Sequence, residues 1–289
     1  MALRSILLGG LGLLVASNAA LATPANASDK APACAYKETV PGTIVQTNGP
    51  LERLIIALNN SNVQIDGVNE PNRISFVFSI CASSEPLLHT VRMKIGSPSF
   101  TPGVFILKID NPNGVDSSSN PTYAYSDLQI SVPASIFAKI NSEAGDISAK
   151  NISELTVKSD SGSITATQVN LLNAASDAGD IYGQDLGDVQ IKKAVSGNVH
   201  ISNAAGDVEV DSIGSGKLTI QNVKGNLTIH SMGTGESNLT QVGGNVIIDK
   251  TSSGGVQEND LDGNFTVKDN GGGSITYSNI KGTVSVAKP

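Results

Sequence analysis

The chain has 289 residues and a formal net charge of −7, with 19 Lys and Arg against 26 Asp and Glu. An acidic chain without clustered basic residues excludes a nucleic acid as partner, because binding to phosphates needs Lys and Arg gathered on one surface. Gly is abundant at 30 residues, Trp is absent and aromatic residues make up 4%, which is typical of short strands joined by tight turns.

The N-terminus has the pattern of a signal peptide. Arg4 gives a basic start, residues 6–16 are an apolar run, and Ala20-Leu21-Ala22 matches the small-x-small pattern before a cleavage site. A membrane span needs about 20 apolar residues, so we prefer a cleaved signal to an uncleaved anchor. We expect removal of residues 1–22, with a cut after Ala27 as a second choice. The mature chain is then expected in the periplasm or outside the cell, with no transmembrane segment.

Two cysteines remain in the mature chain, Cys34 and Cys81. An even number of cysteines in an exported chain favours a disulfide over two free thiols. Such a bond closes a long loop and stabilises the fold by up to about 4 kcal/mol. We therefore expect Cys34 and Cys81 to be bonded.

Residues 23–132 are predicted to be a β-rich N-terminal region. Segments rich in β-formers alternate with Asn-Gly, Asn-Pro and Ser-rich turns, and no segment has the period of a long amphipathic helix. Residues 114–120 are predicted to be a polar loop. The expected strands are 43–47, 54–58, 63–66, 74–80, 91–95, 104–109 and 128–132.

From residue 133 the chain follows a strict repeat of 17–19 residues. Two strand types alternate, and each reads apolar-polar-apolar, which places two side chains inside and one outside. One repeat cannot bury its own apolar pair, whereas parallel stacking buries all of them. Residues 133–289 are therefore predicted to form a parallel β-helix of about eight coils, right-handed as parallel crossovers are. One strand type begins at Ile147, Ile164, Ile181, Val199, Leu218, Ser237, Val256 and Ile275, and the other at Leu155, Leu172, Val189, Val208, Leu227, Val246, Phe265 and Val284.

A polar residue occupies the same place in eight successive coils. Six of the eight are amides, and the two carboxylates are never neighbours. Stacked amides can hydrogen-bond from coil to coil, so we interpret the column as a structural amide ladder. Its members are Asn151, Gln168, Asp185, Asn203, Asn222, Gln241, Asp260 and Asn279.

Glu258 is the odd residue of the predicted core, because it aligns with inward positions that hold Leu239 and Tyr277 in the neighbouring coils. An unpaired buried carboxylate is costly and has a raised pKa. One interpretation is a small polar site in which Tyr277 offers its hydroxyl to Glu258. We prefer the alternative of a local bulge at residues 252–260 that turns Glu258 outward, because Gly254-Gly255 permits one.

The repeat resembles a known family. Its turns, such as Val-Lys-Gly-Asn-Leu-Thr-Ile at residues 223–229, the ending at residues 261–267, 273–277 and 280–286, and the entry segment 128–133 are similar to the bacterial putative adhesin family. Cys81-Ala-Ser after a strand is also similar. The resemblance covers about residues 45–289 and implies a right-handed β-helix with an adhesin-like role.

The search for chemistry in the sequence gives no catalytic set. No acid, base and nucleophile converge in the pattern, and His200 and His230 fall on different strand types, so neither a metal site nor a cofactor is expected. The enzymatic alternative is a polysaccharide lyase, since many lyases are β-helices. Residues 93–289 contain no Arg to bind a uronate, so we predict that the protein is not an enzyme.

The outward positions of both strand types are polar and nearly uncharged. The plainer interpretation is a solvated face of β-formers, and the other is a surface for an envelope protein or glycan. Weak self-association through the C-terminal coil is also expected, because a solenoid end exposes a strand edge. The sequence thus predicts an exported, adhesin-like binding or scaffolding module. The outward residues are Ser148, Thr165, Tyr182, His200, Thr219, Asn238, Gln257 and Thr276 on one type, and Thr156, Asn173, Gln190, Glu209, Thr228, Ile247, Thr266 and Ser285 on the other.

Overall fold

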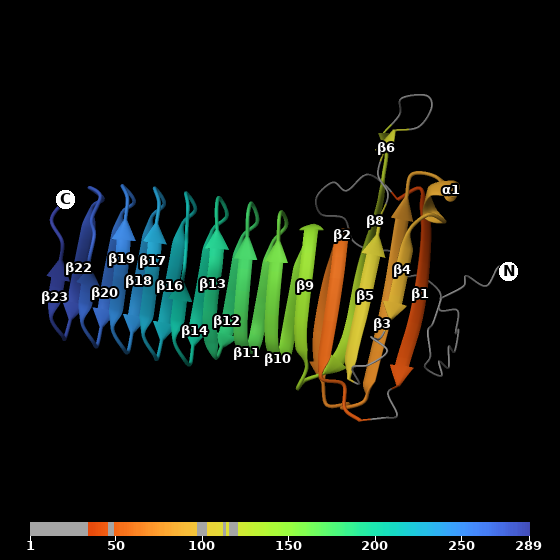
Figure 1. Cartoon of the computed structure of the whole chain (residues 1–289), viewed down its shortest axis with the longest axis horizontal. Helices are drawn as coiled ribbons and strands as arrows, with labels where there is room; N and C mark the ends of the chain where they lie inside the picture. The colour runs from red at the N-terminus through yellow and green to blue at the C-terminus, as the bar shows by residue number, and fades with distance from the viewer. Residues whose placement is uncertain (1–33, 46–48, 97–102, 112–113, 116–120) are drawn as a thin grey trace.

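The computed structural model describes residues 34–45, 49–96, 103–111, 114–115 and 121–289. Strands make up almost all of it and stack into one long solenoid, which broadens into a partly antiparallel region at its N-terminal end (Figure 1). The predicted all-β solenoid is confirmed. The expected signal peptide lies outside the described residues and stays a prediction. In the part of the chain that is described, no helix has the length and apolar character that a membrane span requires.

Two stacks of parallel strands form the sides of the solenoid, and every strand pairs with its counterpart one coil away. The long strands β10 (Ile147–Ser159) and β11 (Ile164–Ser176) contribute to both stacks. The first stack continues with β12 (Ile181–Leu186), β14 (Val199–Ala204), β16 (Leu218–Val223), β18 (Ser237–Val242), β20 (Val256–Leu261) and β22 (Ile275–Ile280). The second stack continues with β13 (Asp188–Ala194), β15 (Val208–Val210), β17 (Leu227–Met232), β19 (Val246–Thr251), β21 (Phe265–Val267) and β23 (Val284–Val286).

The core is a set of columns of apolar side chains that run through the coils. In the first stack Leu218 and Ile220 are fully buried while Thr219 between them points outward, as the apolar-polar-apolar pattern predicts. Each coil also has a buried side chain at the end of the strand, such as Val223 or Met232. The apolar-polar-apolar pattern did not include this position. Each such side chain contributes about 1.5–3 kcal/mol when it is removed from water, and the neighbouring coils supply most of the cover.

A column of glycines explains why the turns repeat as strictly as the strands. Each of these turns lies directly on the turn of the preceding coil, so a side chain has no room there. A Cβ added to Gly216 would lie 1.9 Å from the carbonyl oxygen of Gly197, and one added to Gly235 would lie 2.0 Å from that of Gly216. Only glycine permits this approach of backbone to backbone.

The residues of the predicted ladder occupy the corner at which each coil leaves the first stack. All eight have a positive φ between 54° and 64°, in the left-handed region that Asn and Asp enter more readily than most residues. Hydrogen bonds join some neighbours: Asn203 Nδ2 donates to Asp185 Oδ1 at 2.7 Å, and Asn222 Nδ2 donates to Asn203 Oδ1 at 2.7 Å. The backbone conformation, as well as the stacking, therefore selects the residue type in this column.

The N-terminal region extends the solenoid instead of forming a separate layer. The predicted strands 54–58 and 63–66 are one strand, β2 (Arg53–Val68). On one side β2 pairs with β5 (Val104–Asp110) and β8 (Ala124–Pro133). On the other side it pairs with β9 (Phe137–Ala144) and β10. Strand pairing thus crosses the boundary that the sequence places at residue 133.

Two contacts fix β2 in its place. The Arg53 guanidinium lies over the Phe137 ring, 4.8 Å from its centroid. Asn111 follows β5 and is buried, and its side-chain amide donates to the hydroxyls of Ser61 in β2 at 2.8 Å and Ser126 in β8 at 3.1 Å. Buried hydrogen bonds that join three strands in this way favour one arrangement of those strands.

Antiparallel strands cover the N-terminal end of the solenoid. β3 (Arg73–Ala82) pairs with β8, β1 (Tyr36–Val45) pairs with β3, and β4 (Arg92–Gly96) pairs with β5, all antiparallel. The helix α1 (Glu85–Leu88) follows β3, and β6 (Gly114–Val115) and β7 (Pro121–Thr122) form a short hairpin. The disulfide predicted between Cys34 and Cys81 is confirmed, with 5.5 Å between the two Cα atoms.

The ladder corner gives a first prediction. Asn222→Val is expected to lower the free energy of unfolding by about 2 kcal/mol, because a β-branched side chain is strained at positive φ and the bond to Asn203 is lost. Asn222→Gly should cost much less, since glycine adopts this φ freely. Asn238→Val is the control, because Asn238 is an outward strand residue where Val is favourable. Urea unfolding measures all three, and equal losses for the two valine variants would contradict the prediction.

Candidate functional site

The outward side chains of the first stack form two uncharged columns, which run beside the ladder corner with its two exposed carboxylates, Asp185 and Asp260. Two side chains point outward from each strand over seven successive coils, from β11 to β22, which gives fourteen positions. About a quarter of the residues of an ordinary domain are charged, so this run is a distinct feature of the protein. We call it the uncharged strip, and its residues are Thr165, Thr167, Tyr182, Gln184, His200, Ser202, Thr219, Gln221, Asn238, Thr240, Gln257, Asn259, Thr276 and Ser278.

Polar groups on the uncharged strip are available to a ligand. Within the described part of the chain, the side chains of Thr219, Asn238 and Thr240 make no hydrogen bond with the protein. Tyr182 lies beside His200 of the next coil and is 41% exposed. Its hydroxyl donates to Asp180 Oδ2 at 2.8 Å, and this bond raises the pKa of the Tyr182 phenol.

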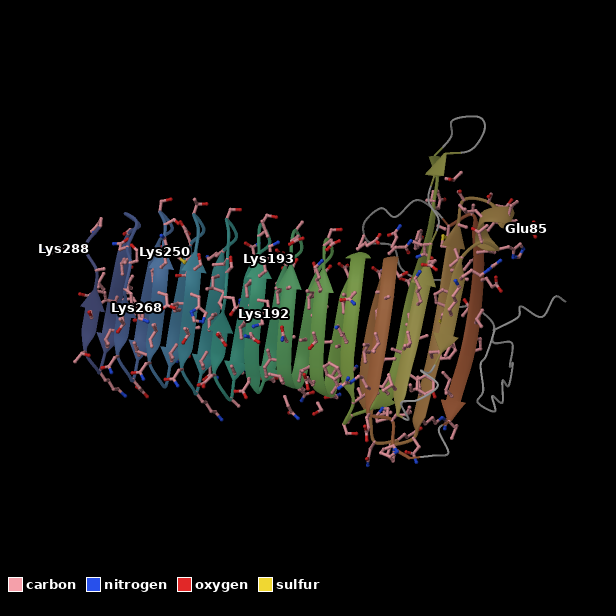
Figure 2. The ribbon with its side chains drawn as sticks, viewed as in Figure 1. Glu85, Lys192, Lys193, Lys250, Lys268 and Lys288 are labelled. Atoms are coloured by element: carbon pink, nitrogen blue, oxygen red, sulfur yellow. A yellow bond between two sulfur atoms is a disulfide. The ribbon has the colours of Figure 1, made fainter. Side chains whose placement is uncertain are left out.

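The outer side of the second stack has a row of alternating charge instead. Lys192, Asp211, His230, Asp249 and Lys268 follow at steps of 19 residues, one in each coil, and Figure 2 labels the two lysines. Lys192 Nζ is 3.2 Å from Asp211 Oδ2, and Lys268 Nζ is 2.7 Å from Asp249 Oδ1. The expectation that this face is nearly uncharged is therefore wrong: it counted one outward residue in each strand and left out the next one.

His230 is the centre of this row. Its Nδ1 is 2.6 Å from Asp249 Oδ2 and its Nε2 is 2.9 Å from Glu209 Oε1, so the ring lies between carboxylates of the preceding and following coils. These two bonds raise the pKa of His230, and the bond to Asp249 has the larger effect. The pKa of Asp249 is lowered, mainly by its bond from Lys268 and next by its bond with His230. His230 and His200 do lie on different stacks. The signal for the carboxylates around His230 is the repeat itself, because a step of 19 residues from His230 reaches Asp211 in the preceding coil and Asp249 in the following one.

Glu258 points into the core. Its strand β20 pairs in register with β18 and β22 through Leu239 and Tyr277, and Glu258 is 0% exposed. The bulge that would turn this side chain outward is absent from β20, so the preferred sequence interpretation is wrong. Gly254-Gly255 lies in the turn before the strand and leaves the register intact.

The alternative polar site is not formed either. Neither carboxylate oxygen of Glu258 has a hydrogen-bond partner among the described residues, so Tyr277 offers no hydroxyl to it. Tyr277 is 51% exposed and its ring packs against Phe265, with 5.8 Å between the centroids. Burial, with a smaller contribution from the charge of Asp260, raises the pKa of Glu258 to about 8. Glu258 is therefore a protonated residue of the core at neutral pH.

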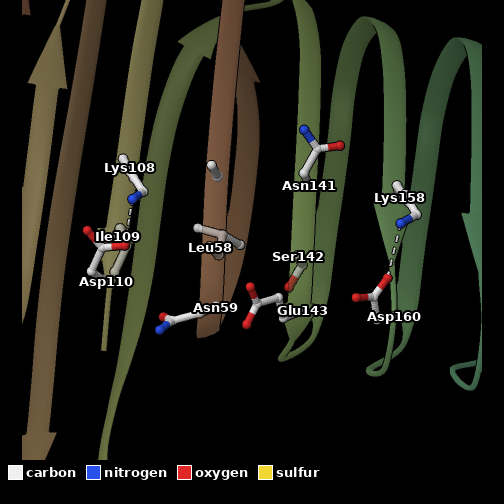
Figure 3. Close-up of a pocket in the computed structure, with 11 residues that line it drawn as sticks. Leu58, Asn59, Lys108, Ile109, Asp110, Asn141, Ser142, Glu143, Lys158 and Asp160 are labelled. Carbon is white, nitrogen blue, oxygen red and sulfur yellow. Dashed lines mark ion pairs between the residues drawn. The ribbon is translucent and has the colours of Figure 1, made fainter. Parts of the chain in front are cut away.

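A hollow lies where the N-terminal region meets the first coils (Figure 3). It has a volume of about 420 Å³ and is lined by the middle of β2 and by the ends of β5, β9 and β10. Two lysines reach it, and each is held by a carboxylate: Lys108 Nζ is 3.1 Å from Asp110 Oδ1, and Lys158 Nζ is 3.3 Å from Asp160 Oδ1. Each pair is exposed and lies at one strand end. Glu143 adds a third carboxylate to the lining, so the described residues leave no free cation there to hold an anionic ligand.

Comparison with known proteins gives distant structural similarity. No family model matches the chain, and no curated protein matches it. The structure is similar to a putative adhesin from Parabacteroides merdae (12% identity, 87% of this chain and 97% of that chain, TM-score 0.39). It is also similar to a putative lipid binding protein from Parabacteroides distasonis (13% identity, 86% of this chain and 97% of that chain, TM-score 0.40). A third similar structure is a putative cell adhesion protein from Clostridium sporogenes (13% identity, 86% of this chain and 99% of that chain, TM-score 0.27).

Burial of Glu258 predicts a stability that depends on pH. The pKa is about 8 in the folded protein and 4.5 in an unperturbed carboxyl, so the folded state holds the proton more tightly. The stability is then greatest below pH 4.5 and falls as the pH rises through 8, by an amount on the order of a few kcal/mol. Glu258→Gln removes the titration, so it should stabilise the protein at pH 9 and change little at pH 5.

Hydrogen exchange of the amides in β20 and β22 measures this effect locally, because terminal coils can open without the rest. Glu236→Gln is the matched control, since Glu236 is exposed one coil earlier and its replacement should change exchange at neither pH. Glu258→Leu should stabilise at both pH values, because it removes the buried polar group. Parallel pH profiles of the wild type and Glu258→Gln would refute the assignment.

Proposed function

We propose that the protein is an exported, non-enzymatic binding module of the cell envelope, which contacts its ligand through the uncharged strip. The observation that supports the proposal is the strip itself, with fourteen outward hydroxyl, amide, His and Tyr side chains on one side of the solenoid. The second stack has the charged row, so the two sides differ although they repeat with the same period. Solubility alone would favour charges on both sides.

The chemistry of the strip favours an uncharged glycan as the ligand. Sugar hydroxyls both donate and accept hydrogen bonds, as the hydroxyl and amide groups of Thr219, Asn238 and Thr240 do. An anionic glycan would need Lys or Arg to balance its charge, and the strip has neither. Tyr182 adds an exposed aromatic face, which can cover the apolar side of a sugar ring.

The solenoid holds these groups at a fixed repeat. Neighbouring parallel strands lie about 4.8 Å apart, so the outward side chains form a regular array that is rigid before the ligand arrives. Little conformational freedom is then lost on binding. A polymer with repeating units can contact several coils at once, and the linked contacts raise the overall affinity without any single strong site.

The location that we propose is outside the cytoplasm, in the periplasm or outside the cell. The Cys34–Cys81 disulfide fits an exported protein. Residues 1–22 are then a signal peptide removed on export, residues 23–132 an N-terminal region that closes one end of the sheet, and residues 133–289 the binding solenoid. A scaffolding role uses the same surface to hold an envelope protein in place of a glycan.

A glycan array tests the proposal. The purified chain should bind uncharged oligosaccharides and leave uronate and sulfated ones, and Thr219→Lys should reduce binding by about tenfold or more, because an ammonium placed in the strip loses hydration without a partner. Thr228→Lys is the matched control: Thr228 points outward at the corresponding place of the second stack, and its replacement should leave binding unchanged.

Two results would contradict the proposal. The first is binding restricted to anionic glycans, or equal losses for Thr219→Lys and Thr228→Lys. The second is release of unsaturated sugar from polyuronates by the purified chain, which would instead support the lyase alternative. Binding to envelope proteins without any glycan signal would support the scaffolding role.

The last coil is proposed as a surface for weak self-association. Tyr277 and Val284 in β22 and β23 are 51% and 37% exposed, so apolar side chains reach the surface of the last coil that the structure describes. Val284→Lys is expected to abolish a concentration-dependent increase in sedimentation coefficient. Val195→Lys, at an exposed valine in the middle of the solenoid, should leave it. A wild type that stays monomeric at the highest concentration, or equal behaviour of the two variants, would exclude this surface.

A further inference from the structure

Three possible metal ligands meet on the charged row, at a place the uncharged strip does not include. The three residues are Glu209 in β15, Asp211 just after β15 and His230 in β17, and all three are half-buried. Each offers one ligand atom, and these atoms lie within 4.8 Å of one another. Register brings them together: Glu209 and Asp211 are outward neighbours in one coil, and His230 stands one coil on, directly beside Asp211.

Asp249 orients the imidazole from the other side. Its Oδ2 is 2.6 Å from His230 Nδ1, and a carboxylate here holds the ring proton on Nδ1. Nε2 is then directed at Glu209 Oε1, 2.9 Å away. A lone pair on Nε2 would face the lone pairs of a carboxylate, so a positive charge is needed between them, either a proton or a metal ion. A carboxylate on the far nitrogen is the usual partner of a metal-ligating histidine.

The donor set favours a metal that accepts both nitrogen and oxygen. One imidazole and two carboxylates suit Zn²⁺, which binds three protein ligands and keeps a fourth position for water. Zinc holds these ligands at about 2.0–2.2 Å in a tetrahedral arrangement, so two ligands of one ion lie about 3.4 Å apart. Atoms already within 4.8 Å of one another reach that geometry by small side-chain rotations.

The charges around the cluster also fit a cation. Glu209, Asp211 and Asp249 contribute three negative charges, and Lys192 and Lys268 balance two of them from the ends of the row. A divalent ion would compete with Lys192, whose ammonium is 3.2 Å from Asp211 Oδ2. Removal of this lysine therefore should strengthen metal binding, which a row built only for stability would not do.

We propose that Glu209, Asp211 and His230 form a zinc-binding site on the outer side of the second stack, with Asp249 as the positioning residue behind the histidine. The site lies on the side of the solenoid away from the uncharged strip, and it does not depend on the function proposed above. Its partially exposed ligands leave the fourth position of the ion open to solvent, or to a ligand atom of another molecule.

Isothermal titration calorimetry of the untagged, chelator-treated chain with zinc chloride tests the site. We expect one zinc ion per chain. His230→Ala should weaken binding by more than tenfold, and Asp249→Ala by about 10–100-fold, the usual effect of losing a carboxylate behind a histidine ligand. Lys192→Ala should bind more tightly than the wild type. His200→Ala is the matched control, because His200 lies on the first stack among uncharged residues, and it should bind as the wild type does.

Thermal unfolding in the presence of chelator shows that each variant is folded, so that loss of binding is read against an intact solenoid. The absence of a stoichiometric zinc signal in the wild type would overturn the proposal. Equal effects of His230→Ala and His200→Ala would also overturn it, and so would weaker binding in Lys192→Ala. In those cases the row is a set of ion pairs between coils and the charge between His230 and Glu209 is a proton.

Discussion

A single coil of this protein exposes its apolar side chains to the coils on either side, and only neighbours in the same register cover them. Leu218 and Ile220 are fully buried because Val199, Ile201, Ser237 and Leu239 occupy the same positions one coil away. The hydrophobic contribution is thus a property of each interface between coils. A one-residue slip would turn these side chains toward solvent, and the glycine column would clash, since Gly216 has no room for a Cβ over Gly197.

The same register that builds the core also arranges the surface. Outward side chains stand in columns along the solenoid, so one substitution per coil is enough to give a whole side a single chemical character. The uncharged strip and the charged row arise in this way from the two strand types of one repeat. Exposed ion pairs such as that of Lys192 and Asp211 stabilise a fold by less than about 1 kcal/mol each. The stability of the core therefore does not by itself account for the residues that stand in these columns.

The period of the repeat was sufficient to predict the strands of the solenoid and the position of the ladder, because stacking ties both to the spacing of apolar residues. The period was not sufficient to predict the positive φ of Asn222, because an amide can form the ladder hydrogen bonds without a left-handed backbone conformation. Glu258 was misjudged for a related reason: burial cost argues against an inward carboxylate, yet pairing on both sides of β20 holds it there. The carboxylates around His230 come from the two coils on either side of it, so the spacing between histidines could not find them, although the 19-residue repeat places Asp211 and Asp249 beside His230. β2 was split in two because its middle, around Asn60 and Ser61, is polar.

The position of β2 has a consequence for the order in which the chain can fold. β2 is made before β5, β8, β9 and β10, but it lies between them and pairs with all four. A strand with partners on both sides cannot complete its pairing until residues 137–150 have been synthesised. Growth of the solenoid from its N-terminal end in step with synthesis is therefore excluded for this segment. The later coils can add one after another. In the N-terminal third, β2 pairs with strands that are synthesised later, and such non-local pairing slows folding.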